Sequence, residues 1–200
     1  MGAMSQHITD SLRIATAQLN PTVGDLDGNL AKARSARAEA APACADVIAF
    51  PDLFISGYPP ADLVLEPAFE RACRARIEAL AQDTADGGPA VLIGTPWRED
   101  GKLHNAYCLL DGGAIMAVRF KVELPNYGPF DEKRVFVPGP MPGPVNLRGV
   151  RIGIPVCEDI WIEDVTECLM ETGASILIAP NGSPWWEGKF DQRQQGALAR

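Results

Sequence analysis

Residues 150–161 read VRIGIPVCEDIW, and the prediction of the fold starts from this stretch. Its first part is apolar and rich in Val and Ile, which predicts a buried strand over residues 150–157. Cys157 stands at the end of that strand and is followed directly by Glu158 and Asp159. Because α/β sheets place ligands at strand ends, this loop is a candidate site. The alternative is that Cys157 is only a small buried apolar side chain, as most free cysteines are.

Two further apolar runs end in polar loops of the same kind. The run 46–50 is followed by Pro51-Asp52-Leu53, and the predicted strand 114–121 ends at Lys121 and continues into residues 122–127. All three loops follow buried strands. They are therefore candidates for a shared site at the strand ends.

The rest of the pattern mixes helical and strand segments. Strands are expected at residues 12–18, 46–50, 89–94, 104–110, 114–121, 150–157 and 174–179. Helices are expected at residues 27–41, with Asp27 as N-cap, 68–84 and 162–171, and a further helix begins before Arg200. The turn Asp111-Gly112-Gly113 indicates a hairpin, and the Pro- and Gly-rich stretch 124–144 is expected to be irregular. This order predicts one layered α/β domain with a mixed sheet.

Charge and composition exclude several classes of function. The formal net charge of −8 opposes binding to nucleic acid or to an anionic membrane surface. The five cysteines are irregularly spaced and form no CxxC pair, which predicts neither a disulfide framework nor a metal site. Residues 1–10 lack the apolar core of a secretory signal, and no run approaches the ~20 apolar residues of a membrane span. We therefore expect a cytoplasmic protein without nucleic-acid or membrane partners.

Five segments resemble the glutamine-dependent NAD synthetases, within the nitrilase or carbon–nitrogen hydrolase superfamily. They are Phe-Pro-x-Leu-x-x-Ser-Gly-Tyr-Pro-Pro at 50–60, Leu-Pro-Asn-Tyr at 124–127, Phe-Asp-Glu at 130–132, Cys-Glu-Asp-Ile-Trp at 157–161 and Asn-Gly-Ser-Pro at 181–184. The resemblance runs from residue 12 to the end of the chain. It implies the nitrilase-type α-β-β-α sandwich, lacking its last elements.

The resemblance also implies catalytic roles. Cys157 would be the nucleophile that forms a thioester, and Lys121 would stabilise both the thiolate and the tetrahedral oxyanion. The backbone N–H of Glu158 would be the second oxyanion donor. The acid at position 52 would carry the proton, and Glu132 would hold Lys121.

Substrate contacts follow by the same resemblance. The residues implied in binding free glutamine are Tyr127, Ser183, Lys189, Glu158 and Tyr58. Lys189 suits the α-carboxylate and Glu158 the α-ammonium. Trp185 and Trp186 are interpreted as packing or domain-contact residues. The alternative for these polar side chains is a packed tyrosine, a turn serine and a surface lysine.

Position 52 departs from the family pattern, which has Glu where this chain has Asp. Asp is shorter by one methylene, and a C–C bond is about 1.5 Å. On an unchanged backbone the carboxylate would fall short of the sulfur. Three explanations compete: a water or a local backbone shift bridges the gap, the site is impaired, or the acid role is shared with a neighbouring carboxylate. We expect a retained but slower glutaminase.

The implied organisation is a glutaminase domain at residues 12–200, incomplete at its end, after a tag-like, disordered segment 1–11. The family's ATP-binding Ser-Gly-Gly-x-Asp-Ser loop does not occur in the sequence. ATP and Mg are expected only in a synthetase domain outside this chain, which would receive the ammonia, and the glutaminase step needs no cofactor. A homo-oligomer is expected. The rivals are a stand-alone small-amide hydrolase of the superfamily and a non-catalytic interaction or regulatory domain.

Overall fold

A computed structural model describes residues 11–184 and 187–199. Its larger sheet has five strands in the order β1 (Ile14–Thr16), β2 (Val47–Ala49), β3 (Ala90–Glu99), β4 (Lys102–Asp111) and β5 (Ala114–Phe120). The first three strands are parallel because helices α1 (Leu26–Ala40) and α2 (Pro67–Asp83) connect them. The last three are antiparallel because tight turns connect them. The predicted hairpin around Asp111-Gly112-Gly113 is confirmed as β4–β5.

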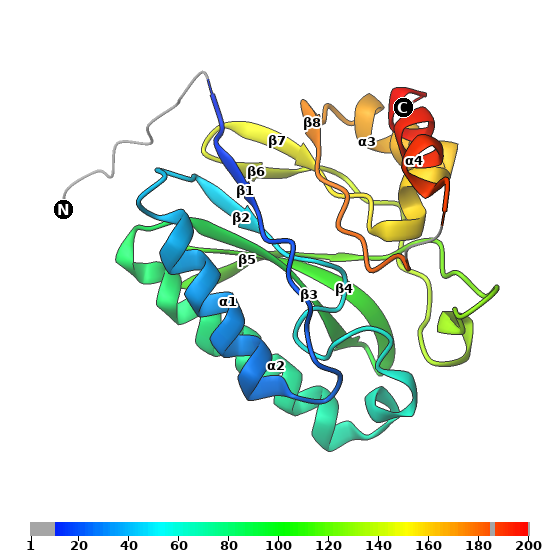
Figure 1. Cartoon of the computed structure of the whole chain (residues 1–200), viewed down its shortest axis with the longest axis horizontal. Coiled ribbons are helices and arrows are strands. Elements are labelled where there is room, and N and C mark those ends of the chain that lie inside the picture. The colour runs from blue at the N-terminus through cyan, green and yellow to red at the C-terminus, as the bar shows by residue number, and fades with distance from the viewer. Residues whose placement is uncertain (1–10, 185–186, 200) are drawn as a thin grey trace.

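Helices α1 and α2 cover one face of this sheet (Figure 1). Alternate residues of β3 and β4 face opposite layers, as the strand period requires. Ile93 and Cys108 belong to the apolar core shared with the helices, whereas Leu92 and Tyr107 belong to the core between the sheets. The N-cap of α1 is Asp25, whose carboxylate accepts from Gly28 N at 3.0 Å, so the prediction of Asp27 was wrong.

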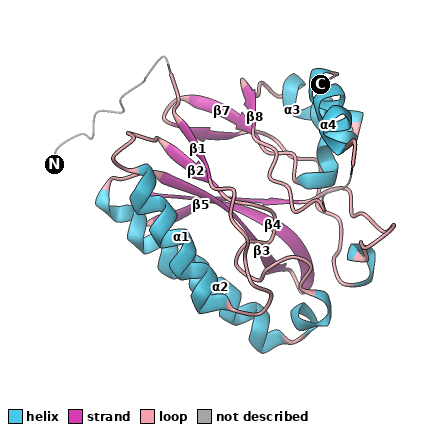
Figure 2. Ribbon diagram, viewed as in Figure 1, coloured by secondary structure: helices cyan, strands magenta, loops and turns pink. Residues whose placement is uncertain are grey.

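A second sheet lies against the other face, with strand order β6 (Val145–Leu147), β7 (Val150–Gly153) and β8 (Ile176–Leu177). Helices α3 (Glu163–Glu171) and α4 (Lys189–Leu198) lie on its side of the molecule (Figure 2). The nitrilase-type α-β-β-α sandwich is therefore confirmed. The mixed sheet expected from the local pattern is confirmed, since each sheet contains parallel and antiparallel pairs. The short strand β6 was not predicted because it has no periodic signal of its own.

The observed strands differ in length from the predicted ones. Hydrogen-bonded β3 continues to Glu99 because β4 pairs with it along its whole length. Strand β7 ends at Gly153, and the chain stays buried through Pro155 to Cys157 without ladder bonds. Proline has no N–H to donate to a neighbouring strand. Cys157 therefore lies in the 3-10 helix η4 (Cys157–Trp161) instead of on the strand.

Within residues 11–184 and 187–199, three other 3-10 helices occur in the loops: η1 (Ala61–Leu65), η2 (Thr84–Asp86) and η3 (Glu132–Arg134). Otherwise the stretch 124–144 has neither α-helix nor strand, as predicted. No helix in the described part of the chain is both long and apolar enough to cross a bilayer. Residues 1–10, Trp185 and Trp186 lie outside the described residues, so the predictions for them stay predictions.

Candidate active site

The loop after β2 carries Asp52 across the middle of β3, at Gly94. Gly94 permits this close approach, because a Cβ on Gly94 would lie 2.2 Å from the backbone nitrogen of Leu53. The hydroxyl of Tyr107 donates to the carbonyl oxygen of Phe50 at 2.6 Å and fixes the entry to the loop. Asp52 is consequently held with no exposed surface.

Lys121 follows β5 and meets two carboxylates in the interior. Its Nζ lies 3.3 Å from Asp52 Oδ2 and 2.8 Å from Glu132 Oε1. Burial opposes the ammonium charge, but the facing acidic groups, Asp52 foremost, hold the pKa of Lys121 above its usual range. Lys121 is therefore a cation at neutral pH although its side chain is fully buried.

Glu132 has three hydrogen-bond donors around it. Besides the lysine, the Tyr58 hydroxyl donates to Oε1 at 2.9 Å and the Asn105 amide donates to Oε2 at 3.3 Å. Burial raises the pKa of Glu132, and Lys121 opposes that rise. Burial and the neighbouring Glu132 raise the pKa of Tyr58, so its hydroxyl remains a donor. These hydrogen bonds fix the orientation of the Glu132 carboxylate that holds the Lys121 ammonium.

Cys157 begins η4 with a φ of 53°, in the left-handed region that non-glycine residues seldom adopt. Its backbone N–H donates to the Pro180 carbonyl at 2.8 Å, and its Sγ lies 4.0 Å from Ser183 Oγ. Only 2% of the residue is exposed. A strained backbone of this kind persists only where the surrounding packing holds it in place. Such residues cluster at functional sites.

The Cys157 thiol is protonated at neutral pH in this environment. Burial, followed by the charge of Asp52, raises its pKa to about 11. Lys121 and a hydrogen bond with the Gly182 backbone act in the opposite direction. A nucleophilic thiolate at this position therefore needs a group that accepts the proton when substrate is bound.

In the predicted scheme, Asp52 is the acid that accepts the Cys157 proton. Its Oδ2 binds Lys121, and its Oδ1 is buried without a hydrogen-bond partner among the described residues. Asp52 therefore forms no hydrogen bond with the Cys157 sulfur. This arrangement agrees with the expectation that the shorter Asp falls short of the sulfur, and catalysis by Asp52 stays a prediction.

Asp159, in the same motif as Cys157, was not predicted as a site residue, but its carboxylate lies between the lysine and cysteine loops. Its Oδ1 accepts the backbone N–H groups of Val122 at 3.1 Å and Glu123 at 2.7 Å, and its Oδ2 accepts that of Val156 at 3.0 Å. Burial raises its pKa to about 6. Position in the motif was the only available signal, because its partners are backbone groups that a sequence does not reveal.

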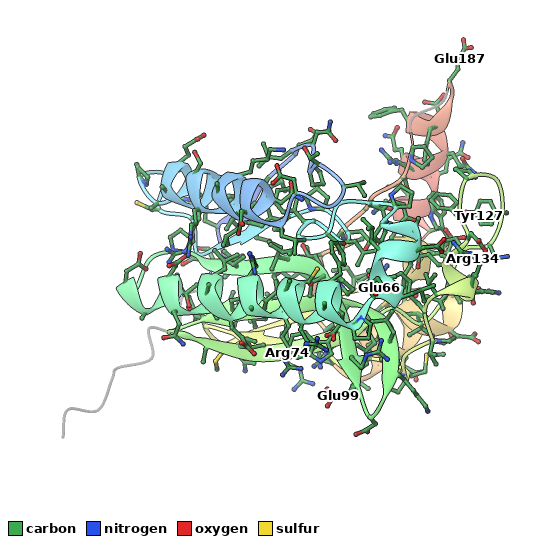
Figure 3. The ribbon with its side chains drawn as sticks, turned by 90° about the horizontal axis from the view of Figure 1, so that it is seen from below. Glu66, Arg74, Glu99, Tyr127, Arg134 and Glu187 are labelled. Carbon is green, nitrogen blue, oxygen red and sulfur yellow. The ribbon has the colours of Figure 1, made fainter. Side chains whose placement is uncertain are left out.

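The predicted substrate residues around Cys157 differ in their exposure and in their hydrogen-bond partners. The Tyr127 hydroxyl donates to the Glu158 carboxylate at 2.9 Å, and burial together with that hydrogen bond raises the pKa of Tyr127 to about 12. Tyr127 is 56% exposed and lies at the outer edge of the molecule (Figure 3). Lys189 is buried and donates to the Pro184 carbonyl at 2.9 Å. The structure thus gathers Tyr127, Glu158 and Ser183 near the thiol and turns the Lys189 ammonium toward backbone.

A two-sheet sandwich with a cysteine beside a buried lysine and two carboxylates is a nitrilase-type architecture. The carbon-nitrogen hydrolase profile matches residues 13–197, so the chain belongs to the carbon-nitrogen hydrolase family. Among relatives, the glutamine-dependent NAD(+) synthetase of Rhodobacter capsulatus is 45% identical over 96% of this chain, and that of Thermotoga maritima 39% identical over 89%. The resemblance drawn from the motifs is confirmed.

Solved structures agree with this assignment. The glutamine-dependent NAD+ synthetase of Acinetobacter baumannii matches with a TM-score of 0.88 and 31% identity over 94% of this chain. An amidase from Nesterenkonia sp. matches with a TM-score of 0.77 and 28% identity, over 90% of this chain and 68% of the amidase. The chain spans about a third of the length of the synthetases, namely 35%, 31% and 35% for the three named here.

Proposed function

We propose that this chain hydrolyses L-glutamine to glutamate and ammonia through a thioester on Cys157. One observation carries the proposal: the strained, buried thiol lies in a cluster where Lys121 is paired with both Asp52 and Glu132. Such a cluster combines a nucleophile, a cation for a developing oxyanion and an acid for proton transfer. The names of the relatives supply the substrate, glutamine.

In the proposed reaction the Cys157 proton passes to Asp52 as the sulfur attacks the side-chain amide carbon. The resulting oxyanion is stabilised by the Lys121 ammonium and the Glu158 backbone N–H. The carbon–nitrogen bond then breaks, and Asp52 returns the proton to the departing ammonia. Water, deprotonated by Asp52, attacks the thioester, and cleavage of the carbon–sulfur bond releases glutamate and restores the thiol.

Substrate recognition in this proposal uses the residues at the mouth of the site. Glu158 would bind the α-ammonium of glutamine, with Tyr127 held beside it. Ser183, 4.0 Å from the sulfur, would contact the substrate close to the reacting carbon. Lys189 would bind the α-carboxylate with an ammonium N–H other than the one it donates to the Pro184 carbonyl, because the ammonium has three donors. Tyr58 would act through Glu132, to which it donates a hydrogen bond.

Ammonia made in this way would serve an ATP-dependent amidation of deamido-NAD to NAD. The support is the names of the relatives, of which this chain spans about a third. The amidation, its ATP and Mg, and the partner domain belong to the proposal for the whole protein. The glutaminase half needs no cofactor in this scheme.

The test is ammonia release from glutamine by the wild type and by Asp52→Glu. The added methylene brings the carboxylate toward Cys157, and we expect roughly a tenfold gain in kcat for better alignment of the base. Asp62→Glu, a matched change at an exposed acid paired with Arg134, should leave kcat unchanged. Equal rates for the wild type and Asp52→Glu would contradict the argument that the shorter Asp side chain leaves the carboxylate short of the Cys157 sulfur.

A second candidate is hydrolysis of another small amide. The match to the Nesterenkonia amidase favours it, because this chain covers twice as large a share of that protein, 68%, as of the synthetases. A panel of ω-amides separates the two candidates: activity on a simple aliphatic amide and none on glutamine would select the amidase.

The third candidate, a non-catalytic domain, is favoured by the unpartnered Oδ1 of Asp52. An electrophilic diazoketone analogue of glutamine tests it directly. A mass increase confined to the Cys157 peptide supports the enzyme. An unmodified Cys157, at analogue concentrations that saturate a control glutaminase, supports the non-catalytic domain.

A further inference from the structure

Asp159 connects the two loops that carry Lys121 and Cys157. Val122 and Glu123, which follow the lysine, donate their backbone N–H groups to one carboxylate oxygen. Val156, which precedes the cysteine, donates to the other. The carboxylate has no exposed surface. A second contact between these loops, Tyr127 with Glu158, is exposed.

The chemistry of this contact requires a carboxylate. Both oxygens of Asp159 accept from backbone N–H groups, and an ionised acid offers acceptors on both sides. An amide would turn its NH2 group toward one of those N–H donors and leave that donor buried and unpaired. Hydrogen bonds to a charged acceptor are about twice as strong as neutral ones, so the anion also makes the tighter connection.

Each bridged loop is anchored independently on its other side. The Lys121 N–H donates to Asn105 O at 2.9 Å, which ties the lysine loop to β4 of the larger sheet. The Cys157 N–H donates to Pro180 O at 2.8 Å, which ties the cysteine loop to the segment after β8. The two catalytic candidates thus belong to different sheets. A connection between the loops is what fixes their separation.

We infer that Asp159 is a positioning residue that sets the separation of the Lys121 ammonium from the Cys157 sulfur. The inference rests on the proposed function only for the roles of the lysine and the thiol. The hydrogen bonds of the Asp159 carboxylate in the described part of the chain go to backbone N–H groups. Asp159 acts through the backbone of Val122 and Val156, one residue from each group.

Two other roles for Asp159 predict different rates of reaction of the Cys157 thiol. If it acted only as a nearby negative charge, its neutralisation would favour the thiolate, and Cys157 would react faster at neutral pH. If it served only stability, the thiol of folded protein would react at the wild-type rate. The positioning role predicts slower reaction, because a more distant ammonium stabilises the thiolate less.

The experiment compares Asp159→Asn with Glu70→Gln in the whole chain. Glu70 is a matched control, since it is also a buried carboxylate that accepts a backbone N–H, from Arg98 at 3.3 Å, but lies on α2 away from the site. Iodoacetamide alkylation of Cys157 is followed by peptide mass spectrometry on folded protein. Ammonia release from glutamine is measured in parallel.

For Asp159→Asn we expect alkylation at pH 7 to slow about tenfold, the equivalent of one pKa unit. We expect kcat to fall about 10²-fold with KM unchanged, because misplacement of about 1 Å has that cost. Glu70→Gln should alter neither. Wild-type or faster alkylation in Asp159→Asn would overturn the inference.

Asp159→Glu keeps the experiment decisive if the asparagine variant does not fold. It retains the charge and both acceptors but lengthens the connection by one methylene. The positioning role predicts slower alkylation of Cys157, whereas a wild-type rate would overturn it. Alkylation requires no glutamine, so a chain that releases no ammonia would refute the proposed glutaminase without deciding the role of Asp159.

Discussion

Cys108 and Cys157 are both buried thiols, but the regions around them are built differently. Cys108 lies on β4 in the apolar core shared with α1 and α2, and burial raises its pKa to about 12. Cys157 lies at a strained residue where loops from both sheets meet, beside Asp52 and Lys121, and its pKa is raised to about 11. The raised pKa does not distinguish them. The difference is that the Cys157 thiol has paired charges and backbone donors within reach.

The helix-covered core gains its stability from burial of apolar surface, about 1.5–3 kcal/mol for each large side chain. The strand-end region buries Asp52, Lys121, Glu132 and Asp159, whose desolvation must be offset by mutual pairing. Mutations in the first region should therefore change stability alone. Mutations in the second should change activity, and in some positions stability as well.

The sharpest test of this difference is to remove each thiol in turn. Cys157→Ala should lower ammonia release from glutamine by at least ~10³-fold, because no nucleophile remains. Cys108→Ala should leave kcat unchanged and lower the free energy of unfolding by about 1–2 kcal/mol. Coupled ammonia assays and urea unfolding measure both. Substantial activity in Cys157→Ala would eliminate the thioester mechanism.

Removal of the buried cation should affect both properties. Lys121→Met leaves Asp52 and Glu132 facing each other without a counter-ion, so kcat should fall about 10²–10³-fold. The free energy of unfolding at pH 7 should fall by about 3–5 kcal/mol. The unpaired acids would have raised pKa values, so the stability penalty should shrink as the pH falls and they protonate.

Lys133→Met is the matched control for that variant. Lys133 pairs with Glu123 at 3.5 Å on the surface, and exposed pairs contribute little. We expect no measurable change in unfolding or activity. Equal stability losses for the two lysine variants would show that the buried network is not the special feature of this region.

The pH dependence of thiol reactivity gives a smaller, graded effect. Below a pKa of about 11 the thiolate fraction of Cys157 increases with pH, so iodoacetamide alkylation should accelerate about tenfold per pH unit from pH 7 to pH 10. Cys108 should stay unmodified over this range because its sulfur is enclosed in the core. A Cys157 rate independent of pH below 8 would mean that Lys121 already holds a thiolate.

The smallest expected effect on activity comes from the helical layer. Ile77→Ala on α2 removes a fully buried side chain and should lower the free energy of unfolding by about 2–4 kcal/mol. The folded fraction should keep the wild-type kcat, because Ile77 has no contact with the strand-end charges. A lower kcat per folded molecule would show that the two regions are coupled.

Much of the fold was predictable because it depends on local patterns. Helical spacing located α1 and α2 within one residue at each end, and Gly112 and Gly113, both at positive φ, marked the β4–β5 turn. The two-residue turn at Arg148 and Gly149 carried a weaker signal, and β6 before it was missed. Three-residue strands depend on their neighbours more than on their own sequence.

The residues of the candidate site were selected by resemblance to family motifs, and their roles stay predictions, whereas their geometry was not predictable. Motif order selected Cys157, Lys121, Asp52 and Glu132, and the structure brings Asp52 and Glu132 onto Lys121. Nothing in the sequence indicated that Asp159 would bind the backbone of Val122, 37 residues away. Nor did it indicate that Lys189 would donate to Pro184 instead of facing open solvent.

The sequence by itself determined the helices and the hairpin, because these depend on residue type and short-range spacing. Its resemblance to the family motifs named the side chains that are candidates for the chemistry. Only the tertiary structure decided that Asp52 reaches Lys121 with one oxygen, while the other has no hydrogen-bond partner among the residues that the structure describes. It also decided that one carboxylate joins the lysine and cysteine loops. Such contacts arise where segments far apart in the chain converge, and their distances follow from how the two sheets pack together.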